Sequence, residues 1–488
     1  MQVVITATLK NAFERNAELS VSADTVRTAL RELTDRFPEA GKLLFDENNA
    51  LRSFLRIFAG EEDVTEESRW EETLPDETEL WLLPVIAGGA AEKESDSLIS
   101  DERRKEVSFD NNEIERFEKH LMLREIGVKG QKRLKAAKVF VAGAGALGSA
   151  VIQYLAASGV GTIKCVDAKE VALSDLGNQV LHTTRDLKRP KTASAKDKVK
   201  NINRGIVFEA ESGGLEASVM PDLIEGYDLV IDCTDNYRDR YLLSDACALA
   251  GIPLIYGAVY QFEGRVSIFN YKGGPCLRCL FPAPPERGLV PTCAEGGTIS
   301  PLPGIIGSIQ ANEAVKLLVG IGEHLSGRLL SIDSLSLRSK IFTVRKNEAC
   351  PVCGKTPSIF EVEDFDYEEF CGLKEPEEEI PVEGFTPEEL AKRIENEDPI
   401  TLIDVREPHE RAILRFPNAL VIPIGQLARR QNELNPEQDT IFICKEGKRS
   451  ILAINTLREA GYKGPMYNLK GGIDAMKDIM FSNEGAWL

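Results

Sequence analysis

The chain has 488 residues, of which 43% are hydrophobic and 28% charged, a composition typical of ordinary globular proteins. At about 150 residues per domain, this length predicts roughly three domains. The formal net charge of −19 is offset by no basic tract, which argues against nucleic acid or an anionic membrane as a partner.

Membrane insertion and secretion are not indicated by the sequence. No apolar run approaches the roughly 20 residues of a membrane span, and the first residues lack the layout of a signal peptide. Ten cysteines include two Cys-x-x-Cys pairs, which without a secretion signal favour metal binding over disulfides. We therefore expect a cytoplasmic protein.

Residues 1–89 predict a small mixed α/β domain. Its apolar pattern predicts strands over residues 3–7, 55–58 and 80–85 and a helix over residues 25–36. The apolar face of that helix would consist of Val26, Ala29, Leu30 and Leu33.

The first domain ends in Gly88 and Gly89, a tail without Cβ atoms that is slim enough to enter a narrow active site. Ala90 follows directly, so Gly89 has no free carboxylate. The charged and poorly periodic residues 90–108 predict a flexible linker.

Residues 109–357 alternate between strand and helix patterns, with buried strands predicted over 138–142, 162–166 and 229–232. Such alternation predicts a parallel sheet covered by helices. An acidic linker is expected over residues 358–382.

A glycine-rich turn follows the first of these strands. Gly143, Gly145 and Gly148 form a G-x-G-x-x-G motif, whose glycines let the backbone approach a polyphosphate at a helix N-terminus. Asp167 ends the next strand, where an acidic residue commonly binds a ribose. The loop alone fits NAD and ATP equally well.

Further motifs remove that ambiguity, because residues 109–357 resemble the MoeB/ThiF family of ubiquitin-activating-like adenylyltransferases. This resemblance implies a Rossmann-like domain that binds ATP with Mg²⁺, adenylates the diglycine terminus of a β-grasp carrier and works as a homodimer. The motifs that carry it are Arg189-Pro190-Lys191, Asp232 to Asn236, Gly257-Ala258, Pro275 to Cys279, Thr292 to Glu295 and Gly304 to Ala311.

The resemblance also implies roles for three side chains. Lys191 would contact phosphate, Asp235 would hold Mg²⁺ and Asp167 would hold the ribose hydroxyls. Neutralisation of phosphate charge is what formation of an acyl-adenylate requires. The alternatives are a solvated lysine for Lys191 and a helix N-cap for Asp235.

Four positions of the candidate ATP site depart from the family pattern. Asp175 and Asn178 stand in the segment where the family generally shows Asn-Leu-Gln-Arg-Gln, so an arginine is lost and a carboxylate gained. Lys119 falls where a family arginine reaches in from the partner subunit, and Lys169 replaces a usual acid. Either Mg²⁺ or Lys169 would have to neutralise Asp175 for ordinary ATP turnover.

The two Cys-x-x-Cys pairs predict one tetrahedral zinc site. Four thiolates without an open position are typical of structural Zn²⁺, the alternative being four unrelated reduced cysteines. The predicted ligands are Cys276, Cys279, Cys350 and Cys353.

Cys293 lies in a Gly/Pro-rich stretch typical of a mobile loop. By the family resemblance it would relay the activated carrier, and the alternative is a buried inert thiol. Cys165, Cys233 and Cys247 lie on strand or helix patterns and are predicted to be core residues, while Cys371 has no assigned role.

Residues 383–488 predict a third α/β domain, with strands over 400–405, 420–422 and 440–444. Cys444 lies between the last of these strands and a helix predicted over residues 451–460, where backbone N–H groups would stabilise a thiolate or persulfide.

Arg449 would add positive charge to the loop that Cys444 begins, and Glu446 would moderate reactivity. With Asp404-Val405-Arg406 and Leu469 to Gly472, this loop resembles the rhodanese fold. A similar layout also serves phosphatases, and an inactive docking domain is the alternative to sulfur transfer.

Beside such domains, residues 1–89 resemble a MoaD/ThiS-type β-grasp sulfur carrier. The leading hypothesis is adenylation of a diglycine carboxylate with ATP, then transfer of sulfur from a Cys444 persulfide to give a thiocarboxylate. Conjugation of the carrier to target lysines and a non-catalytic scaffold are the alternatives.

The hypothesis also predicts partners. A cysteine desulfurase would supply the persulfide, and the carrier would be the N-terminal domain itself or a separate protein. A diglycine-specific metalloprotease would cut between Gly89 and Ala90, or the fused domain is an inert placeholder. The final sulfur acceptor is not identified by the sequence.

Overall fold

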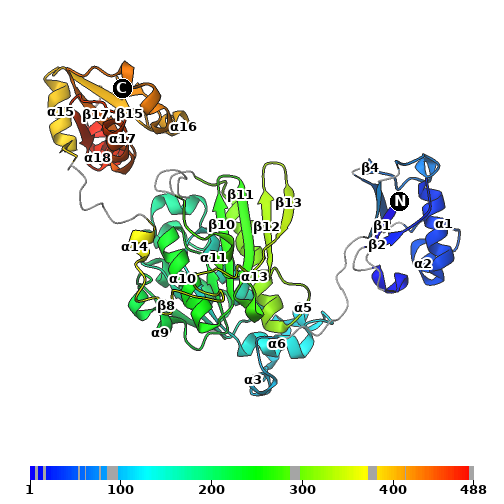
Figure 1. Ribbon diagram of the computed structural model, residues 1–488. Helices are drawn as coiled ribbons and strands as arrows, with labels where there is room; N and C mark the ends of the chain where they lie inside the picture. The colour runs from blue at the N-terminus through cyan, green and yellow to red at the C-terminus, as the bar shows by residue number, and fades with distance from the viewer. Residues whose placement is uncertain are drawn as a thin grey trace. The chain divides into compact units, whose positions relative to one another are not determined.

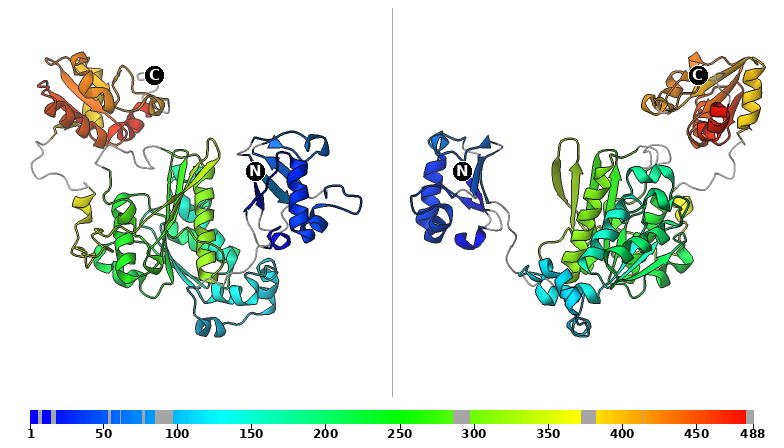
Figure 2. Two further views of the ribbon diagram at one scale, coloured as in Figure 1. Left: turned by 45° about the vertical axis from the view of Figure 1, so that its right-hand side comes forward. Right: turned by 180° about the vertical axis from the view of Figure 1, so that it is seen from behind.

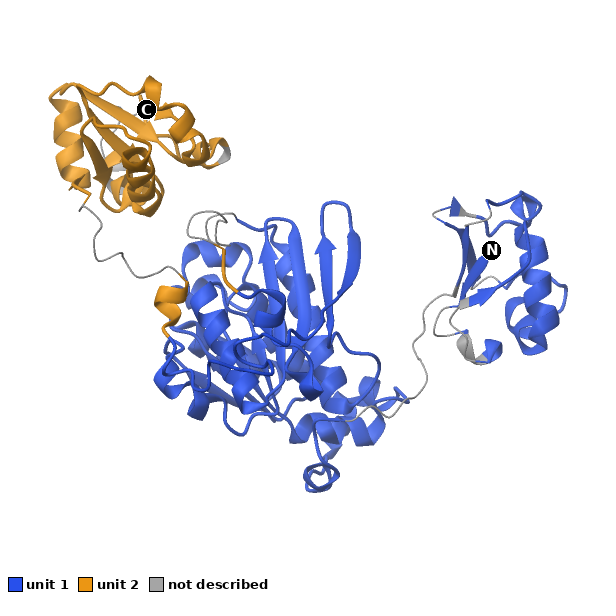
Figure 3. Cartoon of the chain, in the orientation of Figure 1, with its two compact units in different colours: residues 1–282, 292–365 blue, residues 283–291, 366–488 orange. Residues whose placement is uncertain are grey.

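The fold was analysed in a computed structural model. It describes residues 1–5, 9–14, 18–52, 55–60, 62–75, 78–84, 97–285, 297–371, 382–412 and 414–482. One compact unit comprises residues 1–282 and 292–365, and the other comprises residues 283–291 and 366–488 (Figure 3). Within the described segments, no helix is both long and apolar enough to cross a membrane.

The N-terminal residues form a five-stranded sheet in the order β2-β1-β5-β3-β4, in which β1 and β5 pair in parallel (Figure 1). Helix α1 packs on it through the four predicted apolar residues, which are all buried with the strand side chains in one core. The elements are β1 Gln2–Ile5, β2 Glu18–Ser20, α1 Val26–Arg36, α2 Pro38–Leu44, β3 Leu55–Ala59, β4 Glu62–Asp63 and β5 Glu79–Pro84. The predicted strands and helix of this domain are therefore confirmed to within one residue where they are described, and residues 6–7 and 85 of the predicted strands lie outside the described residues.

The central residues form an eight-stranded sheet in the order β13-β12-β11-β10-β9-β6-β7-β8. Strands β8, β7, β6, β9 and β10 are parallel, whereas β11, β12 and β13 extend the sheet in antiparallel fashion. The strands are β6 Lys138–Ala142, β7 Thr162–Val166, β8 Val207–Glu211, β9 Leu229–Asp232, β10 Leu254–Tyr260, β11 Glu263–Phe269, β12 Arg328–Asp333 and β13 Arg338–Thr343. All three strands predicted here have the bounds that the sequence indicated.

Helices cover both faces of the parallel part of this sheet (Figure 2). Helices α7 and α13 pack closely, because Gly307 of α13 has no side chain: a Cβ there would lie 2.6 Å from the Leu147 carbonyl oxygen. The helices are α4 Asn111–Arg116, α5 Glu118–Leu121, α6 Gly127–Ala136, α7 Ala146–Ser158, α8 Lys191–Ile202, α9 Met220–Ile224, α10 Tyr237–Ala250, α11 Leu277–Leu280 and α13 Pro301–Val319.

The prediction of a linker over residues 90–108 is wrong for its second half. Ile99 is 2% exposed and belongs to the central core, and the Ser97 hydroxyl donates to the Leu318 carbonyl at 2.5 Å. Helix α3 (Asp101–Lys105) follows, and its Arg103 forms an ion pair with Asp228. Residues 97–108 therefore belong to the central domain, held by partners that are distant in sequence.

The predicted linker over 358–382 is wrong in the same way for residues 358–371. Ile359 and Val362 are buried, and a short helix, α14 (Tyr367–Phe370), buries its first residue. Isolated apolar residues in an acidic stretch carry no periodicity, so their packing was not visible in the sequence.

The C-terminal residues form a five-stranded, fully parallel sheet in the order β14-β18-β17-β15-β16. The three predicted strands are confirmed, each ending one residue earlier than predicted. The elements are β14 Gly384–Phe385, α15 Pro387–Glu395, β15 Ile400–Asp404, α16 Pro408–Arg411, β16 Leu420–Val421, β17 Asp439–Ile443, α17 Lys448–Glu459, β18 Met466–Leu469 and α18 Gly472–Ser482.

Candidate functional site

The glycine loop connects β6 to α7 at the carboxyl edge of the parallel sheet, as predicted. Gly143 has a φ of +105°, and a Cβ on Gly148 would lie 2.1 Å from the Gly143 carbonyl oxygen. Strands β7 and β9 flank β6, so the chain leaves β6 in one direction and returns on its other side. Ligands of doubly wound folds bind at such a reversal of strand order.

Asp167 is fixed against this loop by two backbone amides. Its carboxylate accepts from Ala144 N and from Lys169 N, both at 2.8 Å. The side chain therefore stands where β7 ends, beside the start of the loop, and its proposed contact with a ribose is compatible with this place.

Lys191, the first residue of α8, is only 4% exposed. Its ammonium forms an ion pair with Asp175 at 3.0 Å, and the other oxygen of Asp175 accepts from Gln179 Nε2 at 2.8 Å. The alternative of a solvated lysine is thus wrong, because a buried ammonium needs a charged or hydrogen-bonding partner.

Asp235 forms an ion pair with Lys169 at the same edge of the sheet. Partial burial raises the pKa of Asp235, but the Lys169 hydrogen bond and charge outweigh it, and the net pKa is lowered. The sequence had suggested that Lys169 could neutralise Asp175, but Lys169 pairs with Asp235 instead. The N-cap alternative for Asp235 is also wrong, because Asn236 caps α10 by accepting from Asp239 N at 2.8 Å.

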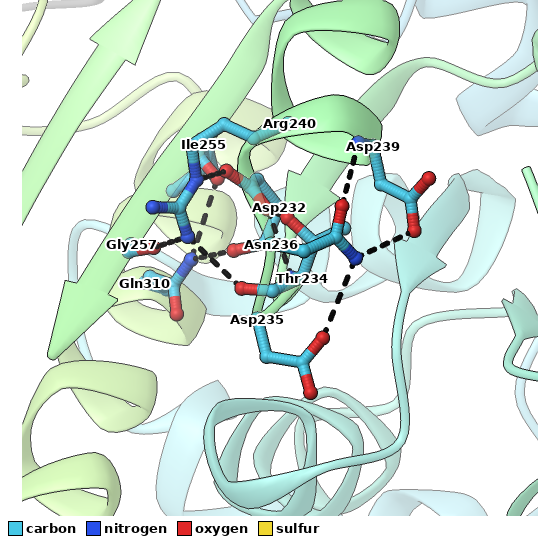
Figure 4. Close-up of polar contacts among 9 residues, drawn as sticks. All are labelled: Asp232, Thr234, Asp235, Asn236, Asp239, Arg240, Ile255, Gly257 and Gln310. Atoms are coloured by element: carbon cyan, nitrogen blue, oxygen red, sulfur yellow. Dashed lines mark hydrogen bonds and ion pairs between the residues drawn. The ribbon is translucent and has the colours of Figure 1, made fainter. Parts of the chain in front are cut away.

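A buried network that the sequence did not reveal holds the turn carrying Asp235 (Figure 4). Arg240 donates to the Asp232 carboxylate at 2.9 Å and to the Thr234 carbonyl at 2.9 Å, while Gln310 donates to the Asp232 carbonyl at 2.8 Å. Figure 4 shows the Asp235 carboxylate turned away from Arg240. Asp232, Thr234 and Gln310 belong to motifs that the sequence showed, but their hydrogen bonds and the part played by Arg240 were not visible there.

His182 is a second residue that sequence analysis missed. Its Nε2 lies 2.9 Å from the Ala144 carbonyl oxygen in the loop, and its Nδ1 lies 2.9 Å from Ser194 Oγ. Burial, aided by the Lys191 charge, lowers the pKa of His182, so the ring is neutral at pH 7. The ring therefore braces the loop without adding charge.

The two remaining predicted ATP-site residues are less constrained. Asn178 is half-buried, and its backbone N–H donates to the Asp175 backbone carbonyl at 3.1 Å. Lys119 lies on α5 with an 85% exposed side chain, 3.5 Å from Glu118. Their predicted contacts with ATP stay predictions.

The four predicted zinc ligands converge, with all Sγ atoms within 4.8 Å of one another. The shorter Sγ–Sγ separations are 3.3 to 3.8 Å. A tetrahedral site with Zn–S bonds of about 2.3 Å requires sulfur atoms roughly 3.8 Å apart, so the geometry fits. Cys165, Cys233 and Cys247 are buried, as predicted, and burial raises the pKa of each thiol.

Three predicted site residues lie outside the described part of the chain. These are the relay candidate and the two glycines of the tail: Cys293, Gly88 and Gly89.

Cys444 directly follows β17 and begins a loop that turns into α17. Its sulfur, in a residue 1% exposed, accepts from Gly447 N at 3.1 Å and lies 3.3 Å from Ser450 Oγ. Gly447 has a φ of +88°, which turns its amide toward the sulfur. The predicted amide environment of Cys444 is therefore present.

Arg449 makes a contact that the sequence did not reveal. Its guanidinium forms two hydrogen bonds with the Glu410 carboxylate, at 2.8 and 2.6 Å. Burial raises the pKa of Glu410, but Arg449 and the Glu407 amide outweigh it, so that the net pKa is lowered. The charge expected to serve the cysteine loop is thus shared with Glu410, while Glu446 is exposed.

Comparison with known proteins finds two family matches along the chain. The model of the ThiF family matches residues 117–352, and that of the rhodanese-like domain matches residues 386–478. The chain is 39% identical over 376 residues to the "Probable adenylyltransferase/sulfurtransferase MoeZ" of Mycobacterium tuberculosis, covering 75% of this chain and 94% of that protein.

Two further relatives are similar. The "Sulfur carrier protein adenylyltransferase" of Thermus thermophilus is 45% identical over 273 residues, which is 55% of this chain and all of that protein. The "Adenylyltransferase and sulfurtransferase MOCS3" of Arabidopsis thaliana is 35% identical over 387 residues, covering 75% of this chain and 83% of that protein.

Proposed function

The chain belongs to the adenylyltransferase/sulfurtransferase family of MoeZ and MOCS3, and from this premise we propose that it activates and then thiolates a carrier protein. ATP adenylates the C-terminal diglycine of a ubiquitin-like sulfur carrier, and a persulfide on Cys444 then supplies sulfur. The product is a protein thiocarboxylate. Conjugation to lysines is disfavoured by the presence of a sulfur-transfer domain in the same chain.

One observation carries the adenylation step. The glycine loop, the buried Lys191 and the carboxylates of Asp167 and Asp235 meet at one edge of the parallel sheet. The carrier carboxylate would attack the α-phosphorus of ATP, and pyrophosphate would leave. Lys191 would stabilise the phosphate charge that develops, and Asp167 would orient the ribose. Asp175 and Asn178 would border the phosphates, and Lys119 would reach them from the second subunit of the homodimer.

The sulfur step uses the second domain. The outer sulfur of the Cys444 persulfide would attack the acyl carbon, and AMP would leave with the bonding electrons. Gly447 N stabilises the sulfur anion before the attack. Arg449 would keep the loop in place. As the relay, the Cys293 thiolate would attack the Cys444 sulfur of the resulting acyl disulfide, so that the S–S bond breaks, the carrier leaves as its thiocarboxylate and a Cys293–Cys444 disulfide forms. An external thiol would then reduce that disulfide.

The donor sets of this chain fit two metals. Asp235 offers a half-exposed carboxylate oxygen beside the glycine loop, the kind of ligand that Mg²⁺ prefers, and Mg²⁺ there would neutralise phosphate charge. The four clustered thiols of Cys276, Cys279, Cys350 and Cys353 suit Zn²⁺. The zinc would tie α11 to the segment after β13 and take no part in catalysis.

The N-terminal domain is proposed to be a β-grasp sulfur carrier spanning residues 1–89. Its sheet order, with β1 and β5 central and parallel and a helix on one face, supports this assignment. The central domain then runs from residue 97 to about residue 365, and the rhodanese-like domain from 383 to 488. The tail would become active after a metalloprotease cuts between Gly89 and Ala90, or the enzyme acts on separate carriers.

The proposed setting is a cytoplasmic homodimer that receives persulfide from a cysteine desulfurase. Pyrophosphate exchange with a carrier ending in a free diglycine tests the first step, and the expected result is exchange that depends on ATP, Mg²⁺ and carrier. Mass spectrometry tests the second: sulfur replaces one oxygen of the carrier. Absence of exchange at high ATP and Mg²⁺ would show that the chain is a scaffold, and a carrier–target adduct would show conjugation.

A further inference from the structure

We propose that Lys169 is a phosphate-binding residue of the nucleotide site, held in reserve by its ion pair with Asp235. This inference rests on the proposed function, in that the loop must bind ATP, and it assigns a role to a side chain whose presence there was unexpected.

Hydrogen bonds of its backbone hold Lys169 beside the glycine loop. Its amide donates to Asp167 at 2.8 Å, and that carboxylate also accepts from Ala144 N in the loop. Its carbonyl accepts from Lys191 N at 3.0 Å. The backbone of Lys169 is therefore tied both to the ribose candidate and to the buried lysine.

The charges at this edge make a second cation necessary. Three carboxylates, those of Asp167, Asp175 and Asp235, face the two ammonium groups of Lys169 and Lys191. The Lys191 ammonium is buried and already matched by Asp175. An incoming triphosphate adds further negative charge, and like charges at close range disfavour binding unless cations compensate.

Lys169 is the group able to respond, because its backbone is pinned while its side chain is 59% exposed. A lysine is a point charge on a flexible stem and can change partners without moving the backbone. With Mg²⁺ bound at the Asp235 carboxylate, the Lys169 ammonium would lose this partner and could turn to the phosphates. The ion pair thus keeps the Lys169 ammonium close to the nucleotide site. It also neutralises Asp235, which would otherwise repel the nucleotide when no metal is bound.

The test is calorimetric binding of a non-hydrolysable ATP analogue and of adenosine to the full chain with saturating Mg²⁺. For K169A we expect affinity for the analogue to fall about tenfold, the typical loss for a charge-assisted hydrogen bond, with adenosine affinity unchanged. K169R should keep most of the affinity, and K200A, which removes an exposed lysine of α8, should match wild type.

The outcomes separate this inference from the proposed function. Wild-type binding of the analogue with unchanged binding by K169A would overturn the role of Lys169 alone. Equal losses for analogue and adenosine in K169A would also overturn it, because they would indicate a structural role. If wild type binds neither ligand, both this inference and the ATP site fail.

Discussion

The glycine loop at residues 143–148 and the cysteine loop at residues 444–450 are built alike but treat negative charge differently. Each follows a buried parallel strand and leads into a helix of 12 or 13 residues. Around the glycine loop, charged side chains form two ion pairs, Lys191 with Asp175 and Lys169 with Asp235. Around the cysteine loop, an amide and a hydroxyl meet the sulfur, and the arginine is held by Glu410.

This difference follows from the anions involved. A triphosphate carries several charges and leaves as pyrophosphate and AMP, so its site needs cations that can change partners. A thiolate or persulfide carries one charge and stays bonded to the protein, so fixed dipoles suffice. Under the proposed function, the same strand-loop-helix unit would serve a transient ligand in one domain and a resident one in the other.

The largest expected effect comes from disabling each loop separately. In G148V the new Cβ would collide with the Gly143 carbonyl oxygen, so carrier-dependent pyrophosphate exchange should fall at least about hundredfold, as misplaced groups commonly cause. In C444S the exchange should remain, while transfer of sulfur to the carrier, followed by mass spectrometry, should be abolished.

Each variant serves as the folding control for the other. Persulfide formation on Cys444 should be intact in G148V, and zinc content should be unchanged in both. If C444S also lost pyrophosphate exchange, the two loops would not act independently, and the assignment of one reaction step to each loop would be wrong.

The next largest effect is expected for D175N, which leaves the buried Lys191 ammonium without a charged partner. Since the Asp175 side chain is 18% exposed, we expect a loss of stability of about 2 kcal/mol, below the range measured for fully buried pairs. A bound ATP analogue restores a counter-charge, so it should raise the melting temperature of D175N more than that of wild type.

D197N is the matched control, because Asp197 pairs with Arg189 at a 62% exposed position. It should change neither the melting temperature nor the response to the analogue. An analogue that stabilises D175N and wild type equally would mean that Lys191 does not face the nucleotide.

Strand bounds in the parallel parts of the central and C-terminal sheets could be predicted because buried parallel strands are continuous apolar runs. The partners of charged residues could not. The sequence offered Lys169 as a neutraliser of Asp175, yet it pairs with Asp235, because strands β7 and β9 both flank β6 and their carboxyl ends meet there. Only the strand order, which is a long-range property, decides such pairings.

The same limit explains the linker error. Ile99 belongs to the same buried core as Leu317 and Leu318, more than 200 positions later, and a single apolar residue in a charged stretch has no period to detect. By contrast, the four zinc ligands could be predicted, because the spacing within each Cys-x-x-Cys pair is itself the signal.

A smaller effect is expected for E410Q, which sharpens the claim that Glu410 holds the cysteine loop. Because the folded pKa of Glu410 is lowered, its pair with Arg449 contributes stability above the unfolded value of about 4.3 and loses it as pH falls through the folded pKa. Cys444 is buried, so its reaction with a pyridyl disulfide, which attacks thiols even in acid, reports opening of the loop.

We expect E410Q to react about fivefold faster than wild type at pH 7, in line with an ion pair whose two side chains are 21% and 13% exposed. The two rates should converge in acid, once the pH falls below the lowered folded pKa of Glu410 and the wild-type carboxylate is protonated. E433Q removes a comparable glutamate that pairs with Arg430 at a 43% exposed position and should react like wild type. A ratio that does not change with pH would show that the effect comes from packing rather than charge.

The smallest effect is expected for S450A, and it tests whether fixed dipoles suffice at the sulfur. The Ser450 hydroxyl has one proton but three neighbours: Asn468 Oδ1 at 2.6 Å, the Gly447 carbonyl at 2.9 Å and the Cys444 sulfur at 3.3 Å. While Cys444 is a thiol, its S–H can donate to Ser450, which itself donates to Asn468. Once a thiolate or persulfide forms, the hydroxyl must turn to the sulfur.

Alanine removes that switch but keeps the Gly447 amide, so the rate of iodoacetamide alkylation at pH 7 should fall only about threefold to fivefold, as expected for one net hydrogen bond. S450T retains the hydroxyl and should preserve the rate. If S450A instead reduced the alkylation rate far more than fivefold, the hydroxyl and not the backbone amide would be the main stabiliser of the sulfur anion. The cysteine loop would then resemble the glycine loop in depending on a movable side chain.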